Sequence, residues 1–139
     1  QQLVDDIGDA LNGSFGQLPG TDSSGAETFL AMATEAGFDG TGAYAPESYD
    51  AAALIMLAME AAGANQSADF KDKVMDVANA PGTEIFPGEL AKAIELLKAG
   101  EDIDYVGATA VELIGSGESA GNFREIEVKD GAIETVKYR

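Results

Sequence analysis

The chain has 139 residues, of which 45% are hydrophobic, so it holds enough apolar material for one modest globular core. Its 25 acidic residues outnumber its 8 Lys and Arg, and the net charge of −17 argues against nucleic acid and anionic membranes as partners. Because His and Cys are both absent, zinc chemistry, triad hydrolysis and disulfides are not expected. We therefore predict no enzyme activity, no metal and no cofactor.

The first third of the chain predicts one strand and one helix. A glycine-rich strand is expected at 11–18, before the turn signal Pro19-Gly20. A helix is expected at about 25–36, because Ser24 and Glu27 have capping-box spacing and a glycine follows as a left-handed stop. The residues before the strand begin in mid-pattern without a basic or apolar signal segment, so we expect any secretion signal to lie upstream or to have been removed.

Three further helices are expected in the middle of the chain. Pro46 opens a helix that is apolar almost all round and is therefore predicted to be buried on most sides, and Gly63 closes it. Ser67 caps an amphipathic surface helix that ends before the break at Pro81-Gly82. Pro87 opens the fourth helix, which has one apolar and one charged face.

The last quarter of the chain predicts β structure. Residues 103–114 mix strand and loop features, and the glycine- and serine-rich run 115–121 is interpreted as a connection. Asp130-Gly131 separates two alternating segments, around 126–128 and 133–138, which is a strong signal for a hairpin. This order of elements has too few strands to cover four helices, so we expect the rest of the sheet to lie outside this chain or to come from another chain.

Two groups of acidic and polar residues partly resemble catalytic or metal-binding sites. Asp102 and Asp104 could bind a cation or act as paired carboxylates, but like charges in a loop after a helix are usually solvated. Asp22, Ser24 and Glu27 match only part of a calcium loop, because the alternating acids and the closing glutamate are absent. We interpret the pair as solvated and the triplet as helix capping.

Segment 44–50 is the candidate for ligand binding. It gathers Tyr44, Glu47, Tyr49 and Asp50 where a loop enters a buried helix. A helix N-terminus presents free amides, and a tyrosine combines an apolar ring with a polar end, which suits a small zwitterionic ligand. The same pattern is equally consistent with Tyr49 packing in the core and Asp50 stabilising the start of the helix.

Several segments also match a known family in collinear order. Glu47-Ser48-Tyr49-Asp50-Ala51-Ala52, continued by an alanine- and leucine-rich stretch to Gly63, resembles the YDA helix of the periplasmic Leu/Ile/Val-binding family. Leu11-Asn12-Gly13-Ser14-Phe15-Gly16 is similar to the family's glycine-rich strand before a hinge crossing, and Ile103-Asp104-Tyr105-Val106-Gly107-Ala108-Thr109 is similar to its DYVGAT segment. The chain from Gly117 to the terminal hairpin resembles the family's C-terminal end. The resemblance covers the whole chain, with departures at Ala110 and at Leu113-Ile114.

This resemblance implies an α/β fold, namely the C-terminal portion of a type I periplasmic-binding-protein fold with four helices and a terminal β-hairpin. In that fold two Rossmann-like lobes are joined by three hinge strands, and the ligand lies in the cleft between the lobes. Residues 1–139 are then a single fragment of a larger two-lobe protein. About 1–18 and 118–139 are expected to be strands of the second lobe, and about 21–109 to be a helical part of the first lobe.

The resemblance also implies a function. We expect a periplasmic, extracytoplasmic solute-binding component of an ABC transporter, which captures an amino acid or a similar small carboxylate and presents its closed form to the membrane permease. Of the residues present, Tyr49 is predicted to bind the ligand, with Glu47 and Tyr44 beside it. Family members hold the ligand mostly through the first half of their sequence, so these residues alone are expected to bind poorly.

Three other expectations follow from the sequence. Apolar faces and strand edges without a partner are predicted to favour pairing with a second copy of the chain. A ligand-sensing regulatory domain of the same fold would share these motifs, and an upstream DNA-binding or membrane segment would identify it. A stand-alone acidic interaction domain is the other alternative, and it predicts a compact monomer.

Overall fold

The computed structural model describes residues 2–115 and 117–139 and has mixed α/β structure that divides into two compact units. Unit 1 comprises residues 2–22 and 121–139, and unit 2 comprises residues 23–120 without the undescribed position 116. The chain therefore passes from unit 1 to unit 2 and back again. In the described part of the chain, no helix is both long and apolar enough to cross a membrane.

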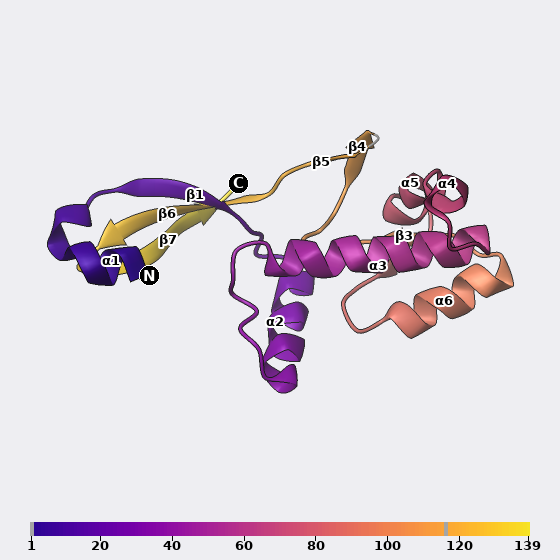
Figure 1. The fold of residues 1–139 in the computed structure, drawn as a ribbon, viewed down its shortest axis with the longest axis horizontal. Coiled ribbons are helices and arrows are strands. Elements are labelled where there is room, and N and C mark those ends of the chain that lie inside the picture. Colours follow the sequence, from indigo (N-terminus) through magenta and orange to yellow (C-terminus); the bar gives the residue numbers. More distant parts are fainter. Residues whose placement is uncertain (1, 116) are drawn as a thin grey trace. The chain divides into compact units, whose positions relative to one another are not determined.

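Unit 1 is a three-stranded antiparallel sheet preceded by a short helical segment (Figure 1). Helix α1 (Gln2–Ile7) continues into the 3-10 helix η1 (Gly8–Leu11). The strands are β1 (Phe15–Pro19), β6 (Phe123–Lys129) and β7 (Ala132–Tyr138), in the order β1-β6-β7. The strand expected at 11–18 begins later than predicted, because the chain is still helical at its first position.

Strands β6 and β7 form the predicted hairpin. Asp130 and Gly131 have φ angles of 50° and 75°, and a two-residue turn with both residues in the left-handed region matches the twist of the strands it joins. Pairing runs from Lys129 opposite Ala132 to the far end of β7. One irregularity leaves Val136 of β7 without a partner opposite it on β6, so a bulge interrupts the ladder.

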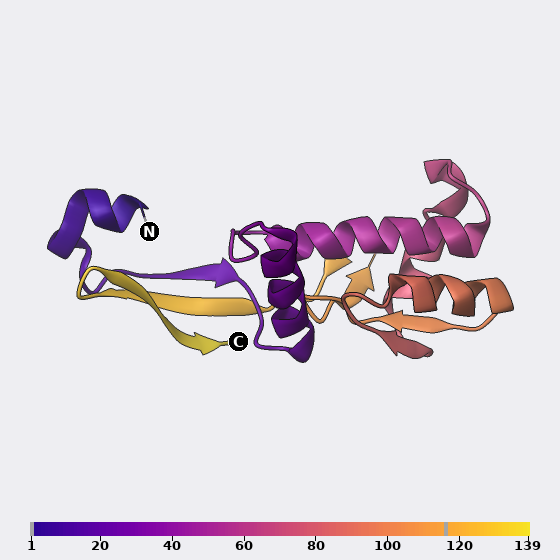
Figure 2. The same cartoon turned by 90° about the horizontal axis from the view of Figure 1, so that it is seen from below.

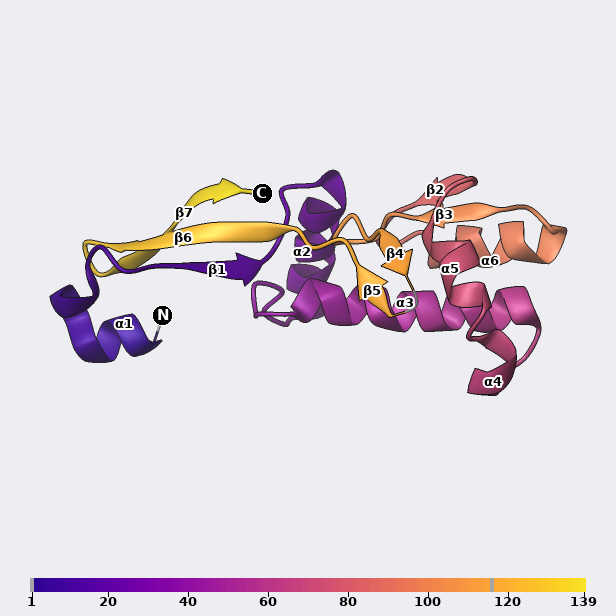
Figure 3. The same cartoon turned by 90° about the horizontal axis from the view of Figure 1, so that it is seen from above.

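Unit 2 is organised around helix α3 (Ala45–Ala62) and the parallel pair β2 (Thr83–Ile85) and β3 (Ile103–Tyr105). Helices α5 (Lys73–Ala78) and α6 (Leu90–Ala99) pack against α3, and in Figures 2 and 3 all three helices lie on the same side of the strand pair. The strands alternate in burial, since Ile85 and Tyr105 are fully buried while the paired Glu84 and Asp104 are not. The core contains Ala53, Leu54, Leu57, Ala58, Val77, Ala78, Ile85, Ala93, Ile103 and Tyr105.

The first two helices of unit 2 differ in detail from the predictions. Helix α2 (Ser24–Ala36) is capped by Ser23, whose Oγ accepts a hydrogen bond from the Ala26 amide over 3.3 Å, so the predicted capping box was placed one residue too late. Helix α3 is not buried on most sides. Its residues at spacings of three and four face the core, whereas Ile55 and Met56 on the other face are 47% and 49% exposed. Alanine tolerates either environment, so composition alone overestimated the burial.

The remaining elements also refine the predictions. The expected third helix is split into α4 (Ser67–Phe70) and α5, and the fourth begins only at Leu90, because Pro87 and Gly88 form a turn in which Gly88 has a left-handed φ of 88°. The run 115–121 is not only a connection, because Gly115 ends strand β4 (Leu113–Gly115) and Glu118 and Ser119 form strand β5 (Glu118–Ser119). These two strands pair in an antiparallel ladder.

Candidate functional site

Asp50 is a buried and heavily hydrogen-bonded side chain of unit 2. It lies on the second turn of α3, is 1% exposed, and accepts four hydrogen bonds. The Tyr105 hydroxyl and the Ala108 amide donate to Oδ1 over 2.9 and 2.8 Å, and the amide and hydroxyl of Thr109 donate to Oδ2 over 2.8 and 2.7 Å. These donors offset the cost of burying the carboxylate. Asp50 thus ties α3 to the loop that leaves the carboxyl end of β3.

Two glycines allow the starts of α2 and α3 to lie close to the loop after β3. Gly107 has a left-handed φ of 62°, and a Cβ at this position would collide with the Asp50 carboxylate and the Tyr105 ring. A Cβ on Gly25, in the first turn of α2, would collide with the Gly107 carbonyl oxygen. The starts of α2 and α3 therefore pack directly against the loop that follows β3.

The Tyr105 hydroxyl is held in its neutral form. Burial raises the pKa of Tyr105 above its ordinary value, and the charge of Asp50 and the hydrogen bond to it raise this pKa further. A phenol that stays protonated is a permanent donor to the carboxylate. With four donors already in place, Asp50 has a structural role in holding the β3 loop and is not arranged for proton transfer.

The three predicted ligand-binding residues lie together at the start of α3. Tyr44 precedes the helix in a left-handed conformation, with φ 65°, and is 61% exposed. Tyr49 is half-buried, its hydroxyl accepts a hydrogen bond from the Gly88 amide over 3.2 Å, and its ring lies 5.4 Å from that of Phe29. Glu47 is half-buried, and its Oε2 atom is buried without a hydrogen-bond partner in the described part of the chain.

The sequence left two interpretations open for this segment: a ligand-binding loop, or a tyrosine in the core beside an aspartate that stabilises the start of the helix. Tyr49 packs against Phe29, as the core alternative expected, but its hydroxyl reaches the turn after β2. Asp50 does not cap the helix, because the four hydrogen bonds that it accepts come from β3 and the loop after it. This role of Asp50 was not predicted from the sequence. The available signal was position, since Asp50 lies on the same helical face as Ala53, Leu54 and Leu57, which are all buried.

The site lies at the carboxyl edge of the β2–β3 pair. The two strands are parallel, so their carboxyl ends share one edge, and Tyr49 contacts the segment after β2 while Asp50 contacts the segment after β3. In open α/β sheets, ligands bind outside the carboxyl ends of the strands. Tyr49 and Asp50 therefore lie at this edge, and Tyr44 and Glu47 precede them in the loop and first turn of α3.

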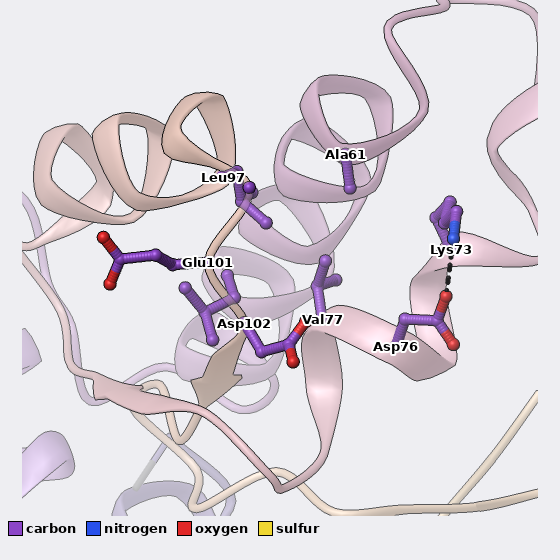
Figure 4. Close-up of a pocket in the computed structure, with 9 residues that line it drawn as sticks. Ala61, Lys73, Asp76, Val77, Leu97, Glu101 and Asp102 are labelled. Carbon is purple, nitrogen blue, oxygen red and sulfur yellow. Dashed lines mark hydrogen bonds and ion pairs between the residues drawn. The ribbon is translucent and has the colours of Figure 1, made fainter.

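A recess lies apart from these residues, at the amino end of β3 (Figure 4). It has a volume of about 180 Å³ and is lined by Ala61, Lys73, Asp76, Val77, Leu97, Gly100, Glu101, Asp102 and Ile103. Lys73 Nζ pairs with Asp76 Oδ2 over 2.9 Å, and this contact raises the pKa of Lys73. Asp102 lines the recess, whereas Asp104, its partner in the sequence pattern, does not. Across residues 2–115 and 117–139, no cluster of His, Cys, Asp or Glu could hold a metal ion.

Comparison with known proteins identifies the fold. The structure matches that of the leucine binding protein LivK from Thermotoga maritima with a TM-score of 0.65, over 99% of this chain and 33% of LivK, at 14% sequence identity. The chain has the fold of part of a type I periplasmic-binding protein. This confirms the predicted fold class.

The sequence comparison agrees with the fold. The chain is 31% identical over 93 residues to a protein of Halobacterium salinarum described as the chemotactic signal transduction system substrate-binding protein BasB. The match covers 66% of this chain and 22% of BasB, so the chain spans about a fifth and a third of the two proteins that it resembles. No protein-family model matches the chain.

Proposed function

We propose that this chain is part of an extracytoplasmic solute-binding protein that captures an amino acid or a related small carboxylate. The observation that carries the proposal is the sequence match to a substrate-binding protein over two thirds of this chain. The same proposal fits the periplasmic-binding-protein fold and an acidic chain without His or Cys. The protein binds and releases its ligand without making or breaking a covalent bond.

We propose Tyr44, Glu47 and Tyr49 as the residues of this chain that contact the ligand. A buried carboxylate oxygen without a donor is energetically costly, and the ammonium group of an amino acid would supply the donor that Glu47 Oε2 lacks. The exposed ring of Tyr44 provides an apolar surface for a side chain. The Tyr49 hydroxyl accepts from the Gly88 amide and can still donate its own proton to a ligand carboxylate.

The transport role extends the same proposal. We assign unit 2 to the first lobe and unit 1 to the second lobe of a two-lobed protein, with the remainder of both lobes supplied by sequence outside these 139 residues. Ligand binding then shifts the protein from an open to a closed form, and the permease of an ABC transporter recognises the closed form. A periplasmic location is part of this proposal.

The test is ligand binding by the full-length gene product that contains these residues. A thermal shift screen against amino acids and small carboxylates identifies the ligand, and isothermal titration then gives its affinity. We expect Glu47→Gln to weaken amino-acid binding about tenfold or more, because the carboxylate–ammonium bond loses its charge. Glu27→Gln is the matched control, since it makes the same change in the first turn of α2 and should leave affinity unchanged.

Two results would contradict the proposal. If no amino acid or small carboxylate stabilises the full-length protein, the capture function is wrong. If a ligand binds but Glu47→Gln and Glu27→Gln behave alike, the function stands and the assignment of Glu47 is wrong.

A second candidate function concerns the partner. The match to BasB favours a protein whose ligand-bound form is recognised by a signalling receptor instead of a permease. Deletion of the gene separates the two partners. Loss of amino-acid uptake supports transport, and loss of movement toward the amino acid with uptake intact supports signalling.

A further inference from the structure

Within the described residues, strand β7 is an open edge of the unit 1 sheet. The strand order β1-β6-β7 leaves its outer side unpaired within the sheet, and all seven of its residues are exposed. Figures 2 and 3 place α1 on the β1 side of the sheet and β7 at the opposite edge. Ile133, Val136 and Tyr138 are 37%, 52% and 38% exposed, so apolar side chains accompany the unpaired backbone. A long edge strand with this composition is a template for another strand.

The outward backbone groups of β7 can be assigned from hydrogen bonds made elsewhere in the sheet. Val128 uses its amide and its carbonyl oxygen for Ser14 and Gly13, both over 2.8 Å, so neither group points toward Ile133 opposite it on β7. Because the two members of such a pair alternate with hydrogen-bonded pairs, the amide and carbonyl of Ile133 point outward.

The other end of β7 follows the same rule. Phe123 and Arg139 exchange two hydrogen bonds of 2.9 and 2.8 Å, so the backbone groups of the preceding residue, Tyr138, also point outward. The open edge therefore offers a donor and an acceptor at Ile133 and again at Tyr138.

These two positions match each other in an antiparallel pairing of β7 with itself. If Ile133 of one copy lies opposite Tyr138 of the other, both can exchange hydrogen bonds with the partner strand. The same register brings Glu134 opposite Lys137 of the other copy, and the two-fold symmetry repeats this contact. We propose that the chain forms a homodimer through β7, with two Glu134–Lys137 contacts across the interface.

The hairpin segment is balanced in charge, although the chain as a whole is strongly acidic. Residues 121–139 contain four basic side chains, Arg124, Lys129, Lys137 and Arg139, and four acidic ones, Glu125, Glu127, Asp130 and Glu134. The net charge of −17 therefore comes from the rest of the sequence. A second copy that approaches the hairpin therefore meets a segment without net charge.

The dimer is weak and depends on concentration. Pairing of one seven-residue strand buries less area than the roughly 1,200–2,000 Å² of a standard stable interface. The contact also competes with pairing inside each copy, because Lys137 Nζ lies 3.6 Å from Glu125 Oε2.

Charge reversal in the full-length gene product tests the register by sedimentation equilibrium over a range of concentrations. At an ionic strength of about 0.15 M the Debye length is about 8 Å, so distant carboxylates are screened while charges on directly opposed residues still interact. We expect Glu134→Lys and Lys137→Glu each to lower the association constant about tenfold, because each creates two like-charge contacts. An equimolar mixture of the two variants should associate again, because every Glu134–Lys137 position then pairs opposite charges.

The controls are Glu95→Lys and Lys98→Glu on the exposed face of α6, which make the same changes in net charge away from β7. In parallel, hydrogen exchange of the Ile133 and Tyr138 amides should slow as the protein concentration rises. A full-length protein that stays monomeric at all concentrations overturns the proposal. So does a dimer whose association constant falls equally in the control variants, or a mixture of the two β7 variants that fails to associate.

Discussion

The two units of this chain are stabilised in different ways. Among the described residues, thirteen of the fifteen buried hydrophobic side chains belong to unit 2, and unit 1 contributes only Val4 and Val128. Unit 1 instead carries seven of the thirteen large hydrophobic side chains that are exposed: Leu3, Ile7, Phe15, Phe123, Ile133, Val136 and Tyr138. Unit 2 thus depends on apolar burial and on the Asp50 network, whereas unit 1 depends on the backbone ladder of its three strands. The comparison predicts that substitutions in unit 2 cost more stability than equivalent substitutions in unit 1.

The largest effect is expected for Asp50→Ala. This change leaves the Tyr105 hydroxyl and the two loop amides without their acceptor, and each stranded buried donor costs about 1–3 kcal/mol, so we expect a loss of about 3 kcal/mol or more. Urea unfolding followed by circular dichroism measures the loss. Asp39→Ala is the matched control, because that exposed aspartate bonds only to the nearby Thr41, and its unfolding midpoint should barely move.

The next largest effect compares the two cores directly. Leu57→Ala removes a fully buried side chain of unit 2 and should cost about 2–5 kcal/mol. Val128→Ala in unit 1 should cost about 1–2 kcal/mol, at about 0.8 kcal/mol for each buried methylene-sized group. Native-state hydrogen exchange assigns each loss to a unit. If either substitution accelerates exchange equally in both units, the units unfold together and are not stabilised separately.

High pH should weaken unit 2 through Tyr105. Its folded pKa is raised, so the contribution is fully present below the unfolded value of about 10 and is lost as pH rises from there toward the folded value. By pH 11 we expect unfolding to become easier by about 1 kcal/mol relative to pH 8. Tyr105→Phe lacks the ionising group, so the difference between its pH profile and that of the wild type isolates this effect. Identical slopes for the two proteins would exclude it.

The smallest effect concerns the start of α6. The Glu89 carboxylate accepts a hydrogen bond from the Phe86 amide over 2.9 Å, and this bond, together with Lys92, lowers the pKa of Glu89. A depressed folded pKa means that the contribution is present above the unfolded value of about 4.3 and is lost as pH falls below it through the folded value. Glu89→Gln should cost about 0.5 kcal/mol at pH 7, as expected for weakening one hydrogen bond at a partly exposed site, and less at pH 3. Glu95→Gln on the same helix should cost less than Glu89→Gln at pH 7.

Much of the local structure was readable from the sequence because it depends on short-range backbone chemistry. Glycines at 37, 63 and 100 end their helices in left-handed conformations, and Asp130-Gly131 turns the terminal hairpin. Errors arose where neighbours in space compete with local preference. Pro87 is compatible with a first helical turn, yet it lies in a separate turn whose Gly88 amide bonds to Tyr49, 39 positions earlier in the sequence.

The candidate site divides in the same way. The gathering of Tyr44, Glu47 and Tyr49 at the start of a helix is determined by the sequence alone, because all three lie within one loop and one helical turn. The role of Asp50 was decided only by tertiary structure. Its four hydrogen bonds come from residues 55 to 59 positions away, and no local pattern specifies which loop will meet a helix at that distance. The buried carboxylate is stable only because the β3 loop supplies its donors, and this loop approaches α3 closely only because position 107 has no side chain.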